Sequence, residues 1–213
     1  MAELRFSIVM PTFRRPQTIF ETIATIQAQT YPHWELIVVD NAGDAGYAFS
    51  DPRIRLFVHA ERTSASHARN QGLGHARGDL VCFFDDDDEM FPDYLEQFAL
   101  AFQGRPEVKM ARCGMVTRRD VNYSYATPEC CLRREFATPT WDESGTCEDQ
   151  RYFGGIIKAH GWTEESGDVV LIPKALCRAL RAPEGGRRSG GYPRSDRWAE
   201  KDRRRPNGQG PRR

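Results

Sequence analysis

The chain has 213 residues, 30 basic and 30 acidic side chains, and 39% hydrophobic residues. This length suits one sizeable domain with its own core and excludes two domains of ordinary size. No run approaches the roughly 18 apolar residues of a membrane span, and the first residues lack the pattern of a signal peptide, so we expect a cytoplasmic protein. The six cysteines show no C-x-x-C spacing, which predicts reduced thiols.

Charge is distributed unevenly along the chain. Residues 183–213 hold ten basic and four acidic side chains, six glycines and four prolines, with almost no apolar periodicity. Such a segment cannot bury enough apolar surface to become ordered. We therefore predict one domain over residues 1–182 and a disordered tail over residues 183–213. The basic tail could make weak peripheral contact with an anionic membrane, but its composition does not predict nucleic-acid binding.

The first elements alternate between strand and helix. Residues 6–10 form an apolar run that Pro11 closes, and the apolar spacing of residues 16–29 is that of a helix. Residues 35–40 form a second apolar strand that ends in an acid. Alternation over residues 54–58 predicts a third strand, of the kind found at the edge of a sheet.

The same alternation continues toward the middle of the chain. Residues 68–76 read as a helix capped by a preceding serine, and residues 80–84 as another buried strand. Pro92 opens a helix with one apolar side, and residues 109–117 form the next strand. This order predicts a single Rossmann-like α/β domain whose mostly parallel central sheet has helices on both faces.

The pattern weakens after residue 117. Residues 118–139 are predicted to be irregular, with one or two strands at most. Residues 147–160 read as a helix, although two adjacent glycines weaken it by about 1 kcal/mol each. Residues 169–172 predict a last short strand, and residues 173–180 a last short helix.

Four consecutive aspartates, residues 85–88, directly follow the apolar strand of residues 80–84. They therefore stand at the carboxyl end of a buried strand, where ligands bind in open α/β sheets. Along an extended segment, Asp85 and Asp87 share one face about 6–7 Å apart, a spacing that suits Mg²⁺ or Mn²⁺ with substrate phosphates. The alternative is a solvated acidic turn that caps the next helix. We favour the metal site, because four adjacent like charges repel.

Five motifs occur in a fixed order: SIVMPTFRRP, ELIVVDNAG, SASHARNQGLGHARGD, FFDDDDEMFPDYLE and WDESGTCEDQRYF. Together they span roughly residues 5–160 and resemble the family 2 glycosyltransferases, which have the nucleotide-diphospho-sugar transferase (GT-A) fold. The resemblance implies a metal-dependent, inverting transfer of a sugar from a nucleotide-diphospho-sugar donor. It leaves the acceptor open: a saccharide, a lipid-linked or a small-molecule hydroxyl.

By this resemblance, four residues lie at the nucleoside. Pro11 and Phe13 are expected against the base, and Asp40 and Asn41 are expected to hold the base and the ribose. Many relatives carry a second aspartate at the position of Asn41. An amide donates as well as accepts hydrogen bonds, so the resemblance does not imply a preference for uridine.

The family's acidic metal motif matches Asp85 and Asp87, with Asp87 as the direct ligand, and Asp86 becomes a candidate ribose contact. A divalent ion across both phosphates would neutralise the charge of the leaving diphosphate. Arg69 could add a guanidinium toward the same diphosphate. Its alternative is a surface arginine paired with Asp79 or a neighbour.

Asp149 matches the general base of inverting members, and Glu148 is expected to orient the acceptor. At the first turn of a helix, Asp149 is expected to be ionised at neutral pH. The alternative for Asp149 is a local capping-box partner of Thr146. Trp141 could offer a face for sugar stacking, although a core role is commoner. Among the histidines only His160 could reach the metal side.

Two function classes remain from the sequence. The first is the metal-dependent inverting glycosyltransferase. The second is a catalytically silent nucleotide-sugar-binding protein of the same fold. A metal nuclease or phosphotransferase is a distant third, because such sites gather further acids that this chain lacks.

Overall fold

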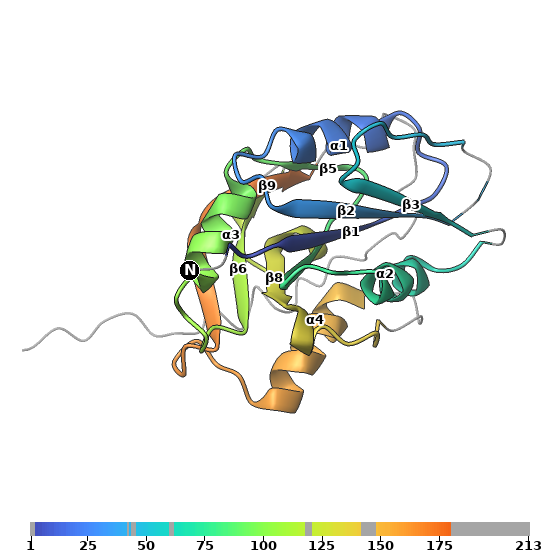
Figure 1. Ribbon diagram of the computed structural model, residues 1–213. Coiled ribbons are helices and arrows are strands. Elements are labelled where there is room, and N and C mark those ends of the chain that lie inside the picture. Colours follow the sequence, from blue (N-terminus) through green and yellow to red (C-terminus); the bar gives the residue numbers. More distant parts are fainter. Residues whose placement is uncertain are drawn as a thin grey trace, which may run out of the picture.

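Apolar runs separated in the sequence form adjacent parallel strands in the computed structural model of the protein (Figure 1). β1 (Phe6–Thr12), β2 (Trp34–Asp40) and β4 (Leu80–Phe83) are buried over their whole length. β1 lies between the other two, and both pairings are parallel. β3 (Ile54–Val58) adds to the outer side of β2 and is only partly buried, which confirms the predicted edge strand.

The structure describes residues 3–41, 43, 46–59, 62–117, 121–141 and 148–179. The predicted tail over residues 183–213 and the capping partner Thr146 lie outside the described residues.

Helices cover both faces of the sheet, as predicted (Figure 1). They are α1 (Thr18–Gln27), α2 (Ala65–Gly74), α3 (Tyr94–Phe102) and α4 (Glu148–His160). α1 and α3 lie on one face, and α2 and α4 on the other. Ser64 caps α2, because its hydroxyl accepts a hydrogen bond from the His67 amide at 3.0 Å. None of the helices among the described residues is both long and apolar enough to cross a membrane.

The second half of the sheet mixes strand directions. Its strands are β5 (Asp88–Met90), β6 (Met110–Val116), β7 (Val121–Asn122), β8 (Cys130–Arg133) and β9 (Val169–Ala179). β8 pairs antiparallel with both β4 and β6, β9 runs parallel to β6, and β5 lies antiparallel on β9. The strand order is β3-β2-β1-β4-β8-β6-β9-β5, with β7 on β6. The parallel part predicted from the sequence is the block from β3 to β4.

The short helix predicted over residues 173–180 is wrong, because the chain continues there as the second half of β9. Ala175 pairs with Gly114 of β6, and Cys177 pairs with Met90 of β5. The residues of this stretch favour a helix locally, but partners on both sides stabilise a strand, and tertiary pairing outweighs so short a local preference.

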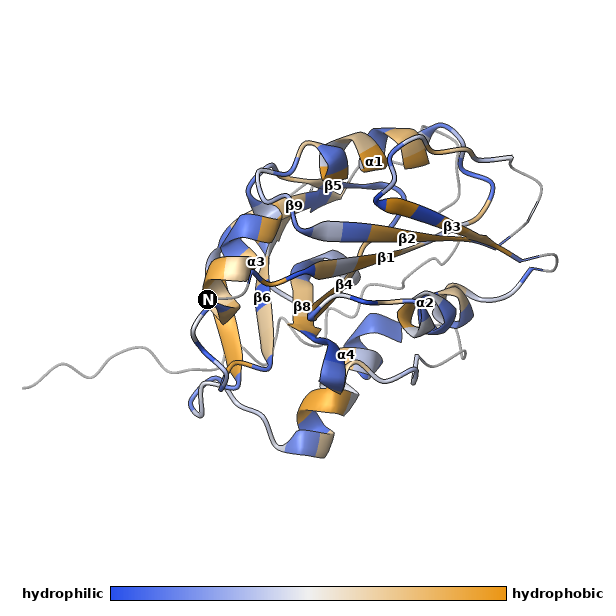
Figure 2. Ribbon diagram, in the orientation of Figure 1, coloured by the Kyte–Doolittle hydropathy of each residue, from blue (hydrophilic) through white to orange (hydrophobic). Residues whose placement is uncertain are grey.

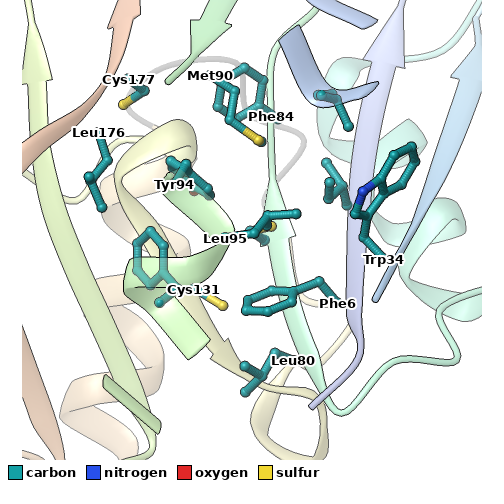
Figure 3. Packing of buried hydrophobic residues seen from close by; sticks show 14 of the residues in the cluster. Phe6, Trp34, Leu80, Phe84, Met90, Tyr94, Leu95, Cys131, Leu176 and Cys177 are labelled. Carbon is teal, nitrogen blue, oxygen red and sulfur yellow. The ribbon is translucent and has the colours of Figure 1, made fainter. Parts of the chain in front are cut away.

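Side chains of each strand alternate between two cores. Ile8 and Met10 enter the core beneath α1 and α3, whereas Val9 enters the one beneath α2 and α4. Figure 2 shows the matching pattern, with hydrophobic strands and helices that are hydrophobic on one side. In the first core, Phe84 and Tyr94 meet edge to face at 5.9 Å (Figure 3).

The cysteines that the structure describes are free and buried, in agreement with the predicted reduced thiols: Cys82, Cys113, Cys130, Cys131 and Cys177. Figure 3 shows two of them, Cys131 and Cys177, among the apolar side chains of the first core. Burial raises the pKa of the Cys131 thiol, and a hydrogen bond with Cys113 together with burial raises that of Cys177, so the nucleophilic thiolate is disfavoured at neutral pH.

The second core holds an aromatic cluster. Trp141 is 2% exposed, stacks on Tyr152 at 4.2 Å and meets Phe83 edge-on at 4.9 Å. These contacts make Trp141 a core residue that fixes α4 against the sheet. They favour the core interpretation over a sugar-stacking face, because Tyr152 and the Arg69 guanidinium already lie against the ring.

Gly72 marks a close approach of α2 to the sheet and carries a stability prediction. A Cβ at Gly72 would lie 2.4 Å from Val9 Cγ1 and 3.2 Å from Val39 Cγ2. We expect Gly72→Ala to lower the free energy of unfolding by about 1–3 kcal/mol, because overpacking outweighs the helix preference of alanine.

The matched control is Gly74→Ala in the same helix, where nothing lies within 4 Å of the added Cβ. We expect this variant to be unchanged or stabilised by up to about 1 kcal/mol. Urea denaturation measures both. If Gly72→Ala is as stable as Gly74→Ala, the close contact is not tight.

Candidate functional site

The four aspartates lie where β4 ends, but they do not continue it as an extended segment. Asp86 and Asp87 form a turn, and Asp88 begins β5. The expectation that strand alternation places Asp85 and Asp87 on one face is therefore wrong. The turn arises because β5 pairs with β9, which takes the chain away from the direction of β4. The partners of each carboxylate, rather than alternation, define the site.

Arg15, in the turn between β1 and α1, holds two of the acids. Its Nη1 lies 3.0 Å from Asp86 Oδ1 and 2.6 Å from Asp87 Oδ2. The Thr12 hydroxyl donates to the other Asp86 oxygen at 2.7 Å. Asp86 is 4% exposed, and burial raises its pKa to about 6, against the opposing effects of Arg15 and Thr12. Asp86 is thus a buried member of the turn, with both carboxylate oxygens engaged.

Arg69 holds the first acid and connects it to α4. Its Nη2 lies 2.7 Å from Asp85 Oδ1, and its Nη1 lies 3.1 Å from Glu148 Oε2. The Ser66 hydroxyl donates to the same Glu148 oxygen at 2.5 Å, and the Thr127 hydroxyl donates to Asp85 Oδ2 at 3.1 Å. One buried guanidinium therefore joins two motifs that are far apart in the sequence.

This arrangement excludes a surface arginine paired with Asp79, and the contact of Arg69 with a diphosphate stays a prediction. The alternative partner, Asp79, accepts a hydrogen bond from the Arg5 amide instead. Arg69 is 6% exposed, and its guanidinium lies 4.7 Å from the Trp141 ring. It is therefore a buried residue between Asp85 and Glu148 and not a surface arginine.

Asp149 lies in the first turn of α4, next to Glu148. Its Oδ1 accepts a hydrogen bond from the Gln150 amide at 2.9 Å. Burial raises the pKa of Asp149 above its usual value, the charge of Asp85 raises it further, and Arg69 opposes the shift. A helix start alone would lower this pKa, so the upward shift is the effect of burial, and the expectation that Asp149 is ionised at neutral pH stays a prediction.

The end of β2 is tied to the loop before α2 by Asn41. Its Nδ2 donates to the Thr63 carbonyl at 2.7 Å, and its Oδ1 accepts from the Thr63 amide at 3.1 Å. The backbone N–H of Asn41 donates to the Thr12 carbonyl. An aspartate could not donate to the Thr63 carbonyl, which gives the amide at this position a structural reason. Asp40 precedes it and is 1% exposed.

Phe13 directly follows β1 and lies beside two arginines. Arg62 lies 4.6 Å and Arg14 lies 5.4 Å from the Phe13 ring centroid. Arg14 has φ 52°, in the left-handed region that non-glycine residues rarely adopt. Pro11 is buried within β1 opposite Val39. The predicted nucleoside residues thus lie at the carboxyl ends of β1 and β2, which are neighbours of each other, and β4 lies beside β1.

Sequence reasoning missed the polar partners of the acids. Arg15, Thr12 and Thr127 all contact the aspartates, yet none was singled out. A signal existed for Arg15, because four adjacent carboxylates require cations and two arginines, Arg14 and Arg15, closely follow β1. The suggestion that His160 reaches the metal side is wrong: it stacks on Trp162 at 5.0 Å in the last turn of α4.

The residues present fit a divalent ion of the Mg²⁺ or Mn²⁺ kind. The side chains of Asp85 and Asp87 are 33% and 24% exposed and offer hard oxygen donors. Within the described ranges, no group of three or more His, Cys, Asp or Glu side chains forms a complete metal site. Two carboxylates with diphosphate oxygens in the remaining positions suit such ions.

The fold is that of the GT-A proteins. The mannosyltransferase PcManGT from Pyrobaculum calidifontis, solved in complex with GDP-Man and Mn²⁺, superposes with a TM-score of 0.68 at 20% identity, covering 86% of this chain and 59% of that one. S. aureus TarS 1-349, solved in complex with UDP-GlcNAc, superposes with a TM-score of 0.69 at 19% identity, covering 89% of this chain and 62% of that one. These likenesses confirm the predicted fold.

The chain belongs to glycosyl transferase family 2, whose family model matches residues 7–152. The amylovoran biosynthesis glycosyltransferase AmsB of Erwinia amylovora is 32% identical over 106 residues, which are 46% of this chain and 35% of that protein. The UDP-Glc:alpha-D-GlcNAc-diphosphoundecaprenol beta-1,3-glucosyltransferase WfgD of Escherichia coli is 35% identical over 101 residues, 45% of this chain and 40% of that protein. The matches thus span two fifths or less of these relatives.

Proposed function

We propose that the protein transfers a sugar from a nucleotide-diphospho-sugar to an acceptor hydroxyl, with inversion at the anomeric carbon. The observation that carries this proposal is the Arg69 bridge between Asp85 and Glu148. It joins the acids expected at the donor diphosphate to the acids expected at the acceptor. An in-line displacement needs these two groups on either side of one reacting carbon.

On the donor side, Asp85 and Asp87 would hold the divalent ion. When bound, the ion supplies positive charge to the leaving diphosphate. Pro11 and Phe13 would contact the base, and Asp40 the ribose, because they lie at the ends of the strands beside the acids. Asn41 would act indirectly, by holding the loop at Thr63.

On the acceptor side, Asp149 would act as the general base. The acceptor oxygen forms a bond to the anomeric carbon as the bond from that carbon to the phosphate oxygen breaks, and the acceptor proton passes to the Asp149 carboxylate. A pKa raised by burial makes this carboxylate a better proton acceptor. Glu148, fixed by Arg69 and Ser66, would orient the acceptor hydroxyl.

The direct test uses a panel of UDP- and GDP-sugars with Mn²⁺ and measures released nucleoside diphosphate. These donors are chosen because the two structural neighbours are complexes with GDP-Man and UDP-GlcNAc. We expect slow release without acceptor and loss of release in EDTA. Asp87→Asn serves as the matched inactive variant.

The same assay separates the second candidate. A silent nucleotide-sugar-binding protein would bind a donor, measured by calorimetry, but would release no diphosphate with any acceptor. The partial coverage of the curated relatives is the observation that keeps this candidate open.

A further inference from the structure

Two arginines pair with the acid turn, which is the segment of four aspartates at residues 85–88, but the surroundings of the two arginines differ. The Arg69 side chain is 7% exposed, also binds Glu148 and lies against Trp141, so it is held on several sides. The Arg15 side chain is 28% exposed and extends from the turn after β1. Arg15 is therefore the more accessible of the two arginines to a ligand that enters from solvent.

Arg15 and a divalent ion would compete for the same carboxylate. The Arg15 Nη1 lies 2.6 Å from Asp87 Oδ2, and Asp87 is the expected direct metal ligand. Two cations on one carboxylate repel each other, and each weakens the attraction for the other. Binding of an ion at Asp87 thus requires Arg15 to find another anion.

We propose that Arg15 is a diphosphate-binding residue that exchanges Asp87 for a donor phosphate oxygen, so that metal binding depends on the nucleotide. The inference rests on the function proposed above. Guanidinium groups bind phosphate oxygens with two parallel hydrogen bonds, which makes a diphosphate a suitable second partner. Arg15 follows β1 and Asp87 follows β4, and these two strands are neighbours in the sheet.

Asp86 supports this exchange. Its second oxygen accepts a hydrogen bond from the Thr12 hydroxyl at 2.7 Å, so the buried carboxylate keeps a partner when Arg15 shifts. Asp86 also lies 3.0 Å from Arg15 Nη1 and so keeps the guanidinium next to the turn. Thr12 and Asp86 therefore stay paired with each other while Arg15 exchanges Asp87 for a phosphate.

The proposal predicts a coupling that acts in both directions. If the nucleotide raises the affinity for the ion, the ion raises the affinity for the nucleotide by the same factor. Removing the Arg15 charge weakens this coupling, because the ion then binds Asp87 without displacing a cation.

The test measures Mn²⁺ affinity by calorimetry, with and without saturating UDP or GDP. In Arg15→Gln we expect Mn²⁺ alone to bind about tenfold tighter than in the unaltered protein. The factor by which saturating nucleotide raises the Mn²⁺ affinity should be about tenfold smaller. Arg15→Met, a second uncharged variant, should behave alike if the glutamine variant folds poorly. Arg105→Gln is the control, because it removes an exposed arginine paired with Glu107.

Equal Mn²⁺ affinity without nucleotide in the folded Arg15 variants and the unaltered protein would overturn the inference. The proposed function would then stand, provided that the unaltered protein binds Mn²⁺ with nucleotide. Failure of the unaltered protein to bind Mn²⁺ even with UDP or GDP would contradict the metal-dependent function itself and the inference with it.

Discussion

Replacing Asp149 with asparagine is expected to lower turnover by about 10² or more, while the free energy of unfolding changes by well under about 1 kcal/mol. An asparagine oxygen can still accept the hydrogen bond of the Gln150 amide, which the Asp149 carboxylate accepts at 2.9 Å. It cannot take the acceptor proton. Turnover per folded molecule and thermal unfolding measure the two effects, and nucleotide binding should remain.

A purely local role gives the opposite outcome. If Asp149 only caps α4, Asp149→Ala would cost about 0.5–2 kcal/mol and leave the rate per folded molecule unchanged. The pH profile adds a second measurement. Because burial raises the pKa of Asp149, activity should fall with decreasing pH at values above those of an ordinary aspartate, as the base becomes protonated. An active Asp149→Asn enzyme would remove this residue from the mechanism.

Replacing Asp87 with asparagine is expected to reduce turnover by at least about 10² and to abolish most of the dependence of nucleotide binding on Mn²⁺. Its carboxylate is 24% exposed, and its salt bridge with Arg15 is partly solvated. We therefore expect stability to change by less than about 1 kcal/mol. Calorimetry with GDP and UDP, with Mn²⁺ or EDTA, measures the binding effect.

The matched control is Asp93→Asn, which removes another partly exposed acid paired with a cation, Lys174. Asp93 lies at the start of α3, outside the acid turn. It should retain turnover and metal dependence. A steep fall in melting temperature for Asp87→Asn alone would assign that acid a structural role and argue against the metal site.

Local pattern accounts for the buried parallel strands. β1, β2 and β4 are apolar on both faces, so their sequences read as strands without knowledge of their neighbours. β9 differs, because its second half contains Ala175 and Leu176, which suit a helix as well as a strand. Its state depends on pairing with β6 and β5, which no local window contains.

The same distinction applies to the candidate site. Asp85, Asp87 and Asp149 stand out because their motifs are short and continuous. Arg15 and Asp86 are 71 residues apart, and Thr127 and Asp85 are 42 apart, so these contacts depend on the fold. The direction of the Asp149 pKa shift likewise follows from burial, which the helix position alone does not reveal.

The strand that pairs with the end of the acid turn is β9, which contains none of the five motifs. β5 begins at Asp88 and pairs with the end of β9, where Arg178 also binds Glu89 across 89 residues of chain. During synthesis, β5 can therefore pair with β9 only after nearly the whole described chain has been made. A shortened protein ending at residue 153, one residue past the family match, would contain every motif but lack the strand that holds β5. Synthesis of β9, rather than appearance of the motifs, thus sets the moment at which β5 gains its partner.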